Sequence, residues 1–279
     1  MGMSINTNLS ALNTYRNLNA TQNDLSKSLE KLSSGLRINR AADDAAGLSI
    51  SEGLKSQVGG LTVAARNAQD GISVVQTAEG GLTETHSILQ RMRDLAVQAG
   101  NDSNNADSRT AISTEVGELS KELTRISQST NFNGINLLDG SAGTAGVLKF
   151  QVGANGDAAS QIDVDLSGAN VATVATSVTG MDFTTADGAQ AAIKTIDAAI
   201  KTVSTARSNI GAIQNRFDHA INVTNVAKEN LTAAGSRITD VDMAEEMVKY
   251  TRDNILSQAG TSMLAQANQS TQGVLSLLR

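Results

Sequence analysis

The stretch LSSGLRINRAADDAAGL, residues 32–48, decides how this chain folds, because it separates two long helical patterns. Upstream of it, apolar residues recur every three or four positions, which is typical of one face of an α-helix. Within it, Arg37 and Arg40 stand close to the adjacent carboxylates Asp43 and Asp44. The stretch therefore either carries a paired-carboxylate site or connects two helices.

The upstream pattern predicts one long helix with a heptad-like apolar seam. The seam consists of Leu9, Leu12, Tyr15, Leu18, Leu25, Leu29, Leu32 and Leu36, with Gln22 in its one gap. Its opposite face is polar, so a single copy of this helix would be only marginally stable. Gly35 stands where the helix can end, residues 37–40 would form a polar connector, and Asp43 would begin the next helix and favour its N-terminal dipole.

Downstream, a second apolar seam from Leu54 to Ala96 predicts a helix about 60 Å long. The polar turn at residues 100–108 ends it, and the spacing from Ile112 to Ile126 predicts a returning helix. Short alternating segments at 147–152 and 162–166 predict small strands, with a low-complexity linker as the alternative. Helical periodicity returns from Ile193 to Leu231, and a last helical segment carries Val241, Ala244, Val248, Thr251 and Ile255.

This order predicts a mainly α protein, a long antiparallel helical rod with paired terminal helices and a small central β-hairpin region. We expect residues 1–40 and 236–279 to form the two halves of an inner helical domain. Residues 41–140 and 191–235 would form an outer helical domain, and residues 141–190 a small β-rich segment of Gly and Thr. Because the terminal helices leave apolar surface exposed, we expect them to be fully ordered only when copies of the chain stack.

The composition excludes several kinds of function. The chain has no proline, although about 5% is usual, and the absence of proline suits long helices. If the chain crosses a narrow channel unfolded and then refolds, the absence of proline would also avoid the delay caused by prolyl isomerisation. It has no cysteine, so disulfides and thiolate metal sites are excluded. The net charge of −6 disfavours nucleic acid and anionic membranes as partners. We find neither a cleaved secretion signal nor an apolar stretch long enough to span a membrane.

No enzymatic motif stands out. His86 and His219 are isolated, and no metalloprotease, nucleotide-binding or serine-hydrolase pattern occurs. Side chains adjacent on a helix point about 100° apart, so Asp43 and Asp44 are poor candidates for a shared substrate. Helix capping and ion pairs with Arg37 and Arg40 are the preferred interpretation. We therefore expect no catalytic residue, cofactor or metal ion.

Several segments resemble bacterial flagellin closely, and they cover both ends of the chain and the adjoining helical regions. They are LSSGLRINRAADDAAGL, RNAQDGISVVQTAEGGL (66–82), LQRMRDLAVQ (89–98), NFNGINLLDG (131–140), GAIQNRF (211–217) and QAGTSMLAQANQSTQGVLSLLR (258–279). The resemblance implies a structural subunit that polymerises into the extracellular flagellar filament used for swimming. It also implies export, unfolded, through the flagellar type III apparatus, a chaperone at the C-terminal region, and filament cap and hook-associated proteins as partners. Because the central segment is short, we expect a thin, smooth filament.

The resemblance also implies roles for particular residues. Inner-tube assembly would involve Leu9, Leu12, Leu25, Leu29, Leu32, Val274, Leu275, Leu277 and Leu278. Recognition by a vertebrate Toll-like receptor would involve Arg91, Leu95 and Glu115, although the same patch also packs subunits and Asp94 replaces the commoner Glu. The alternative is a hook–filament junction protein. A flagellin that carries a protease insert is disfavoured, because no zinc signature occurs and the short centre leaves no room for a catalytic domain.

Overall fold

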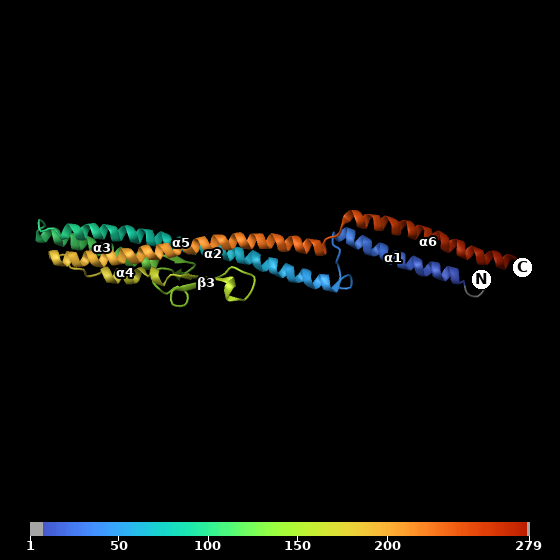
Figure 1. The fold of residues 1–279 in the computed structure, drawn as a ribbon, viewed down its shortest axis with the longest axis horizontal. Helices are drawn as coiled ribbons and strands as arrows, with labels where there is room; N and C mark the ends of the chain where they lie inside the picture. Colours follow the sequence, from blue (N-terminus) through green and yellow to red (C-terminus); the bar gives the residue numbers. More distant parts are fainter. Residues whose placement is uncertain (1–7, 278–279) are drawn as a thin grey trace. The chain divides into compact units, whose positions relative to one another are not determined.

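A computed structural model describes the backbone of residues 8–277 and the side chains of residues 8–269. Within this range the chain is mainly α-helical, as predicted (Figure 1). The helices are α1 (Leu9–Ser34), α2 (Ala45–Ala99), α3 (Ala106–Ser129), α4 (Val171–Val178), α5 (Ala186–Thr239) and α6 (Met243–Leu277). The strands are β1 (Asn131–Phe132), β2 (Ile135–Asn136), β3 (Val147–Gln151) and β4 (Gln161–Asp165).

The chain divides into two compact units, and α2 and α5 contribute to both. The first unit comprises Met1–Ser56 and Asn230–Arg279, and the second comprises Gln57–Glu229. In the first unit α1 and α6 lie side by side and antiparallel, so that the beginning of α1 lies near the end of α6 (Figure 1). The predicted pairing of the terminal helices is therefore confirmed.

The ends of α1 are set by local chemistry. The side chain of Asn8 accepts a hydrogen bond from the backbone N–H of Ala11, which satisfies one of the free donors of the first turn. At the other end Gly35 adopts a left-handed conformation with φ of 73°, and its N–H donates to the carbonyl oxygen of Lys31. Glycine adopts this conformation without steric cost, so the predicted end of the helix at Gly35 is confirmed.

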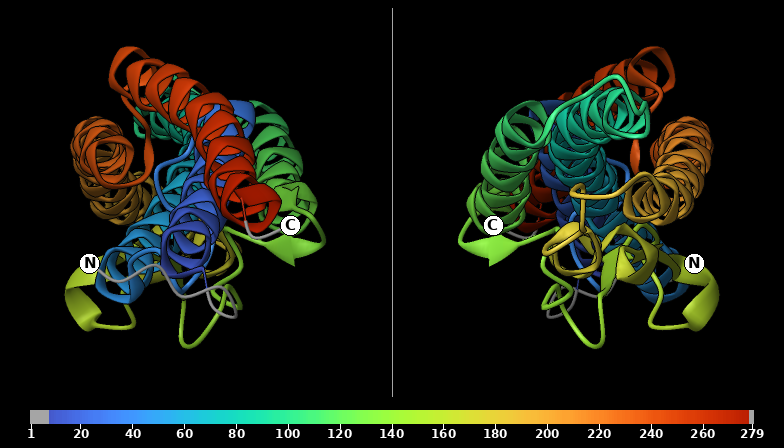
Figure 2. Two further views of the ribbon diagram at one scale, coloured as in Figure 1. Left: turned by 90° about the vertical axis from the view of Figure 1, so that its right-hand side faces the viewer. Right: turned by 90° about the vertical axis from the view of Figure 1, so that its left-hand side faces the viewer.

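The second unit has an apolar core between α2, α3 and α5 (Figure 2). Phe217 of α5 is fully buried there, and its ring lies against Gly71 of α2 so closely that a Cβ atom at Gly71 would come within 2.6 Å of it. Phe150 of β3 meets the same ring edge-on, with 5.6 Å between ring centroids. Gly71 therefore leaves room for the aromatic ring of Phe217, which occupies the space that a larger side chain at this position would need.

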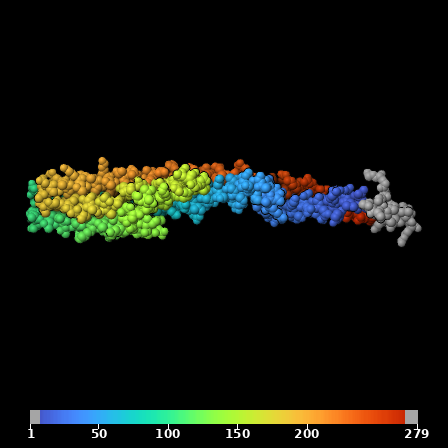
Figure 3. Space-filling view, turned by 90° about the horizontal axis from the view of Figure 1, so that it is seen from below, coloured from blue at the N-terminus to red at the C-terminus, as the bar shows by residue number. Residues whose placement is uncertain are grey.

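The segment between α3 and α5 covers part of one face of the second unit (Figure 3), and its apolar side chains join the core of that unit. Strands β1 and β2 form a tight hairpin whose turn residues, Asn133 and Gly134, both have positive φ. Strands β3 and β4 pair antiparallel, and β4 alternates buried Ile162 and Val164 with exposed polar residues. The predicted strands are therefore confirmed and the linker alternative is wrong.

The sequence did not predict α4 within this segment. Asn170 caps it by accepting a hydrogen bond from the N–H of Thr173, and it buries Val171, Val174, Ala175 and Val178. Valine favours strands intrinsically, but positions spaced by three and four place these valines on one buried helical face. The central segment is therefore part helical as well as β-rich.

Candidate functional site: the terminal helix pair and its connectors

The terminal helix pair, α1 with α6, meets along two regular series of buried and half-buried positions. Both series alternate steps of three and four residues, which is the spacing of a helix–helix seam. On α1 they are Ala11, Thr14, Leu18, Thr21, Leu25, Ser28 and Leu32, and on α6 Glu246, Tyr250, Asp253, Ser257, Gly260, Leu264 and Ala267. The contact between the helices is therefore made largely by small and polar side chains.

Three contacts fix how the two helices are aligned. At one end the Asn8 side chain donates a hydrogen bond to the carbonyl oxygen of Ala267 over 2.9 Å. In the middle Leu18 packs against Gly260, where a Cβ atom would lie 3.2 Å from the Leu18 Cδ1. Nearer the connectors, the Ser28 hydroxyl donates to Glu246 Oε1 over 2.6 Å. Together these contacts define one antiparallel alignment along the described length of α1.

Most of the large apolar side chains of the terminal helix pair point away from this contact, whereas four leucines lie within it, namely Leu18, Leu25, Leu32 and Leu264. Leu9 is 71% exposed, Val248 69% and Met263 65%, and further apolar side chains on the two helices are also exposed. These additional side chains are Leu12, Tyr15 and Leu29 on α1, Met243, Met247, Ile255 and Leu256 on α6, and Leu36 just beyond the end of α1. We call these eleven residues the outward apolar faces. An exposed apolar surface of this kind is typical of a site that packs against another protein.

The single seam predicted for α1 is thus divided between two faces. Leu18, Leu25 and Leu32 are buried or half-buried, whereas Leu9, Leu12 and Leu29 are exposed. Of the other predicted assembly residues, Val274, Leu275 and Leu277 belong to α6, but their side chains lie outside the described residues, as does the whole of Leu278. The assembly role of all these residues stays a prediction.

One connector joins α1 to α2 (residues 35–44) and another joins α5 to α6 (residues 240–242). Hydrogen bonds link the first connector to the second and to the end of α5. The backbone N–H of Arg37 donates to the carbonyl oxygen of Thr239 over 2.6 Å, and that of Val241 donates to Gly35 over 3.1 Å. The Arg37 guanidinium adds two bonds, from Nε and Nη2, to the carbonyl oxygen of Ile238 at 3.1 and 2.7 Å. Arg37 therefore satisfies carbonyl groups that the C-terminus of α5 would otherwise leave free. We call this set of bonds the connector clasp.

The adjacent carboxylates have separate structural roles. Asp43 Oδ2 accepts hydrogen bonds from the backbone N–H groups of Arg40 and Asn39, and these bonds lower the pKa of its carboxyl. Asp44 Oδ1 accepts from the N–H of Gly47 over 2.8 Å and so caps α2. The prediction that Asp43 begins the helix is wrong, because α2 starts at Ala45 and Asp44 is its cap.

The arginines of the connector have partners that sequence reasoning only partly found. Arg37 lies 3.8 Å from Asp44, as anticipated, whereas Arg40 pairs with Glu30 of α1 at 2.9 Å. The carbonyl oxygen of Ile238 was missed altogether as a partner of Arg37. No local pattern signals that bond, since the two residues are 201 positions apart.

The three predicted receptor-contact residues lie close together in the second unit, but in different environments. Arg91 Nε and Nη2 donate to Glu115 Oε1 at 2.9 and 2.7 Å, which joins α2 to α3 through an exposed ion pair. Leu95 is only 3% exposed and belongs to the core beneath. The surface itself is therefore formed by Arg91 and Glu115.

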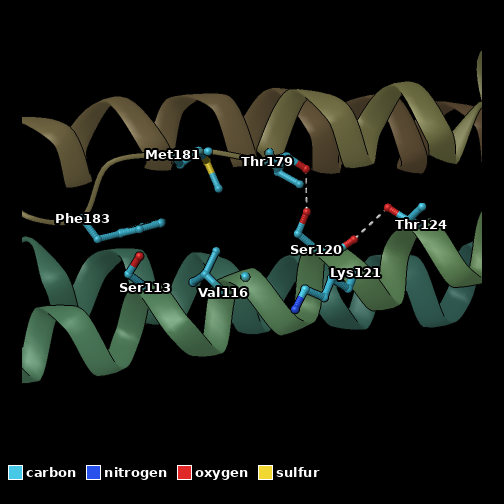
Figure 4. A pocket seen from close by; sticks show the side chains of 11 residues that line it. Ser113, Val116, Ser120, Lys121, Thr124, Thr179, Met181 and Phe183 are labelled. Carbon is cyan, nitrogen blue, oxygen red and sulfur yellow. Dashed lines mark hydrogen bonds between the residues drawn. The ribbon is translucent and has the colours of Figure 1, made fainter.

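A hollow of about 400 Å³ lies between α3 and residues 178–183 (Figure 4). Val116, Met181 and Phe183 supply its apolar lining, and Ser120 and Thr179 hydrogen-bond to each other over 2.7 Å at its side. Lys121 at the hollow pairs with Glu118 at 2.8 Å. This arrangement brings together no nucleophile, base and orienting group of the kind that covalent catalysis uses.

Among the residues that the structure describes, no group of three or more His, Asp or Glu side chains could hold a metal ion. No helix in the same range combines the length and apolar character needed to cross a membrane.

The unit formed by the two chain ends turns apolar faces outward, which is typical of the class of proteins that pack against other proteins. Family comparison specifies the class. Residues 5–143 match the family described as the bacterial flagellin N-terminal helical region, and residues 193–278 match the bacterial flagellin C-terminal helical region. The chain therefore belongs to the bacterial flagellin family.

Individual relatives agree with this assignment. The chain is 51% identical to a flagellin of Halalkalibacterium halodurans, over 99% of this chain and 100% of that protein. It is 45% identical to the flagellar filament 33 kDa core protein of Treponema phagedenis, with the same coverage of both chains. A solved structure described as a flagellar hook-associated protein from Vibrio parahaemolyticus has a TM-score of 0.56 and covers 71% of this chain and 100% of its own. At 15% identity it shares the fold alone.

The protein is accordingly a structural subunit of the bacterial flagellar filament, and the hook-associated alternative is set aside. Flagellin relatives match nearly the whole chain at 45–51% identity, which the hook-associated structure does not approach. The family is one of structural proteins that polymerise, so the principal partner of the chain is another copy of itself.

Proposed function

We propose that the terminal helix pair is the part of the subunit through which copies pack into the inner tube of the filament. The observation that carries this proposal is the orientation of its side chains, since mostly small and polar residues face the partner helix and most of the large apolar residues face outward. In this proposal residues 1–40 and 236–279 form the inner domain, residues 41–140 and 191–235 form the outer domain, and residues 141–190 form a separate small β-rich segment. The compact unit made of the two chain ends supports this division.

Energetics favour assembly as the step that stabilises the terminal helix pair. Burying an exposed Val, Leu, Ile or Met side chain completely stabilises a protein by about 1.5–3 kcal/mol. The contact between α1 and α6 buries few such side chains, whereas the outward apolar faces carry many of them. Contact with neighbouring copies would therefore supply most of the apolar burial available to these two helices.

The same weakness suits export before assembly. A terminal helix pair with little apolar contact of its own unfolds easily, and a chain without proline or cysteine refolds without isomerisation or disulfide exchange. We infer export through the flagellar type III apparatus, with a chaperone covering the apolar face of α6 beforehand. Addition of subunits would take place beneath the filament cap, beyond the hook-associated proteins, so that the product lies outside the cell.

The assembly proposal is tested by making one outward face polar. We expect the double variant Val248→Ser and Ile255→Ser to lose elongation of filament seeds, measured by electron microscopy and sedimentation, because two exposed apolar side chains of α6 are removed. The control is Ala259→Ser with Thr261→Ser, two exposed positions on the same helix that carry no large apolar side chain. Normal elongation by the first variant would contradict the proposal.

A truncation tests the end of α6. Deleting residues 274–279 should leave the second unit folded, because none of these residues belongs to it. Filament growth should stop, since the deletion removes three predicted assembly residues within α6 and Leu278 beyond it. Circular dichroism would report the folded outer region, and normal filaments would exclude the predicted role.

Receptor recognition is a second candidate function, favoured by the exposed ion pair between Arg91 and Glu115. Monomeric protein with Arg91→Ala should activate reporter cells that carry the Toll-like receptor less than wild type does. Arg125→Ala is the matched control, because Arg125 also forms an exposed ion pair on α3, with Glu122. Equal losses in both variants, or no loss in either, would exclude a specific role for Arg91.

A further inference from the structure

The terminal helix pair contains one buried charge. Glu246 is the only buried charged residue in the part of the chain that the structure describes, and its side chain is 7% exposed. It lies on the face of α6 that meets α1, within the first turn of that helix. Burying a carboxylate is costly unless hydrogen bonds replace its water, so its position requires an explanation.

The carboxylate has one partner on each helix. Oε1 accepts the hydrogen bond of 2.6 Å from the Ser28 hydroxyl of α1, which is itself buried. Oε2 lies 3.7 Å from Lys249 Nζ on its own helix, and Lys249 also pairs with the exposed Glu245 at 2.8 Å. Ser28 is therefore the cross-helix partner that the alignment of the two helices brings to Glu246.

The recurring side chains of the α1 seam discriminate poorly between alignments. On α1, leucines recur at residues 18, 25 and 32, and small polar residues recur at 14, 21 and 28. A shift of one heptad therefore places leucine where leucine was. It would, however, move Gly35 or Thr21 into the place of Ser28, and Gly35 has no side-chain donor while the Thr21 hydroxyl is bonded to the carbonyl oxygen of Asn17. In the observed alignment the Ser28 hydroxyl bonds Glu246, whereas in a shifted one Thr21 would first have to give up its bond to Asn17.

We propose that Ser28 and Glu246 determine the register of the terminal helix pair, so that α1 and α6 pair in one alignment among several of similar apolar packing. A buried polar contact that fixes register at some cost in stability is established for coiled coils. The inference rests on the proposed function, because register decides which side chains of the outward apolar faces stand next to one another. The contact thereby selects the surface that neighbouring copies meet.

Register can be read directly with engineered disulfides, since the natural chain has no cysteine. A Cβ atom at Gly260 would lie 3.8 Å from the Leu18 Cβ, which matches the mean separation in disulfides of about 3.8 Å. The double variant Leu18→Cys and Gly260→Cys reports the observed register. Pairing Gly260→Cys with Ala11→Cys, or with Leu25→Cys, reports a shift of one heptad in either direction.

Glu246→Leu is then placed in each reporter, and disulfide yield is measured on non-reducing gels after mild oxidation of assembled and unassembled protein. We expect the yield of the 18–260 disulfide to fall about fivefold and that of a shifted disulfide to rise, since the cost of an unpaired carboxylate no longer opposes the shift. Glu246→Gln, which keeps an acceptor for Ser28, should retain the 18–260 disulfide. Ser28→Ala should change the disulfide yields in the same direction as Glu246→Leu, with less of the 18–260 disulfide.

Glu245→Leu is the matched control, because Glu245 is the exposed neighbour of Glu246 on α6. Its disulfide pattern should equal that of the parent reporter. An unchanged 18–260 yield in Glu246→Leu would overturn the proposal, and so would loss of all three disulfides, which would make Glu246 necessary for pairing itself. Seed elongation is scored separately. A variant that keeps the 18–260 disulfide but fails to elongate counts against the assembly proposal and leaves register determination standing.

Discussion

The guanidinium of Arg37 donates two hydrogen bonds to the backbone carbonyl oxygen of Ile238, 201 residues away in the sequence. Its own backbone N–H donates to the neighbouring carbonyl oxygen of Thr239. One residue of the first connector therefore completes the hydrogen bonding at the C-terminus of α5. The segment that leaves α1 and the C-terminal end of α5 are thereby held to one another.

Replacing Arg37 should loosen the connector clasp. In Arg37→Ala the carbonyl oxygen of Ile238 loses two hydrogen-bond donors. We expect the free energy of local opening at the connector clasp to fall by about 1–2 kcal/mol, which would be measured as faster amide hydrogen exchange at Val241. Arg40→Ala is the control, because Arg40 is more exposed and pairs only with Glu30 among the contacts described for its side chain. Equal protection of Val241 in wild type and Arg37→Ala would show that the guanidinium adds nothing to the backbone bonds.

Two glycines of α2 should respond to alanine in opposite directions. At Gly71 the new Cβ would lie 2.6 Å from the Phe217 ring, so Gly71→Ala should lower the free energy of unfolding by about 1–3 kcal/mol through overpacking. At Gly80 nothing lies within 4 Å, so Gly80→Ala should raise it by up to about 1 kcal/mol through helix propensity. Thermal unfolding followed by circular dichroism measures both. A stabilised Gly71→Ala variant would contradict the packing described.

The loop before α5 should be sensitive to acid. Asp182 Oδ1 accepts hydrogen bonds from the Thr184 hydroxyl at 2.6 Å and from the Thr184 N–H at 2.8 Å, and these lower the pKa of its carboxyl. Since the folded-state pKa is below the unfolded one, the stabilisation is complete above about pH 4 and is lost as the pH falls through the folded-state pKa. The amide shift of Thr184 across an acid titration would show the transition.

Two variants sharpen the acid titration. Asp182→Asn should abolish the transition at Thr184, because the side chain no longer ionises. Thr184→Val removes the hydroxyl donor but keeps the backbone donor, so its midpoint should move to higher pH. A midpoint that does not move would exclude the hydroxyl as the main cause of the lowered pKa.

The outer surface of the filament should be smooth. Residues 131–185 form two small hairpins and α4, all of which pack on the helices of the second unit or on each other. A cryo-EM reconstruction is expected to show a filament without outward-projecting domains. Density for such a domain would contradict this expectation.

Much of the secondary structure could be predicted from sequence, because helix periodicity and capping are local properties. The C-terminal end of α1 at Gly35 and the strands β3 and β4 could be predicted from residue type and spacing. The face of α1 that meets α6 could not be predicted in this way. Leu9 and Leu18 both fit spacings of three and four, and only tertiary packing distinguishes the exposed residue from the buried one.

The missed parts of the site share a physical cause. The bonds of Arg37 to Ile238 and of Ser28 to Glu246 join positions more than 200 residues apart, so neither residue's neighbours in sequence signal its partner. Helix α4 was missed because valine favours strands intrinsically, whereas its burial pattern here is helical. Long-range contacts and tertiary environment decided these cases.

The outward direction of the apolar side chains on α1 and α6 also has a kinetic consequence. Two free subunits offer each other little pre-formed surface, whereas the end of an existing polymer presents several ordered copies at once. The first few additions therefore face a high barrier, and later ones a much lower barrier. Growth from seeds should outpace spontaneous nucleation, so that a solution of subunits stays unpolymerised until it meets an end to extend.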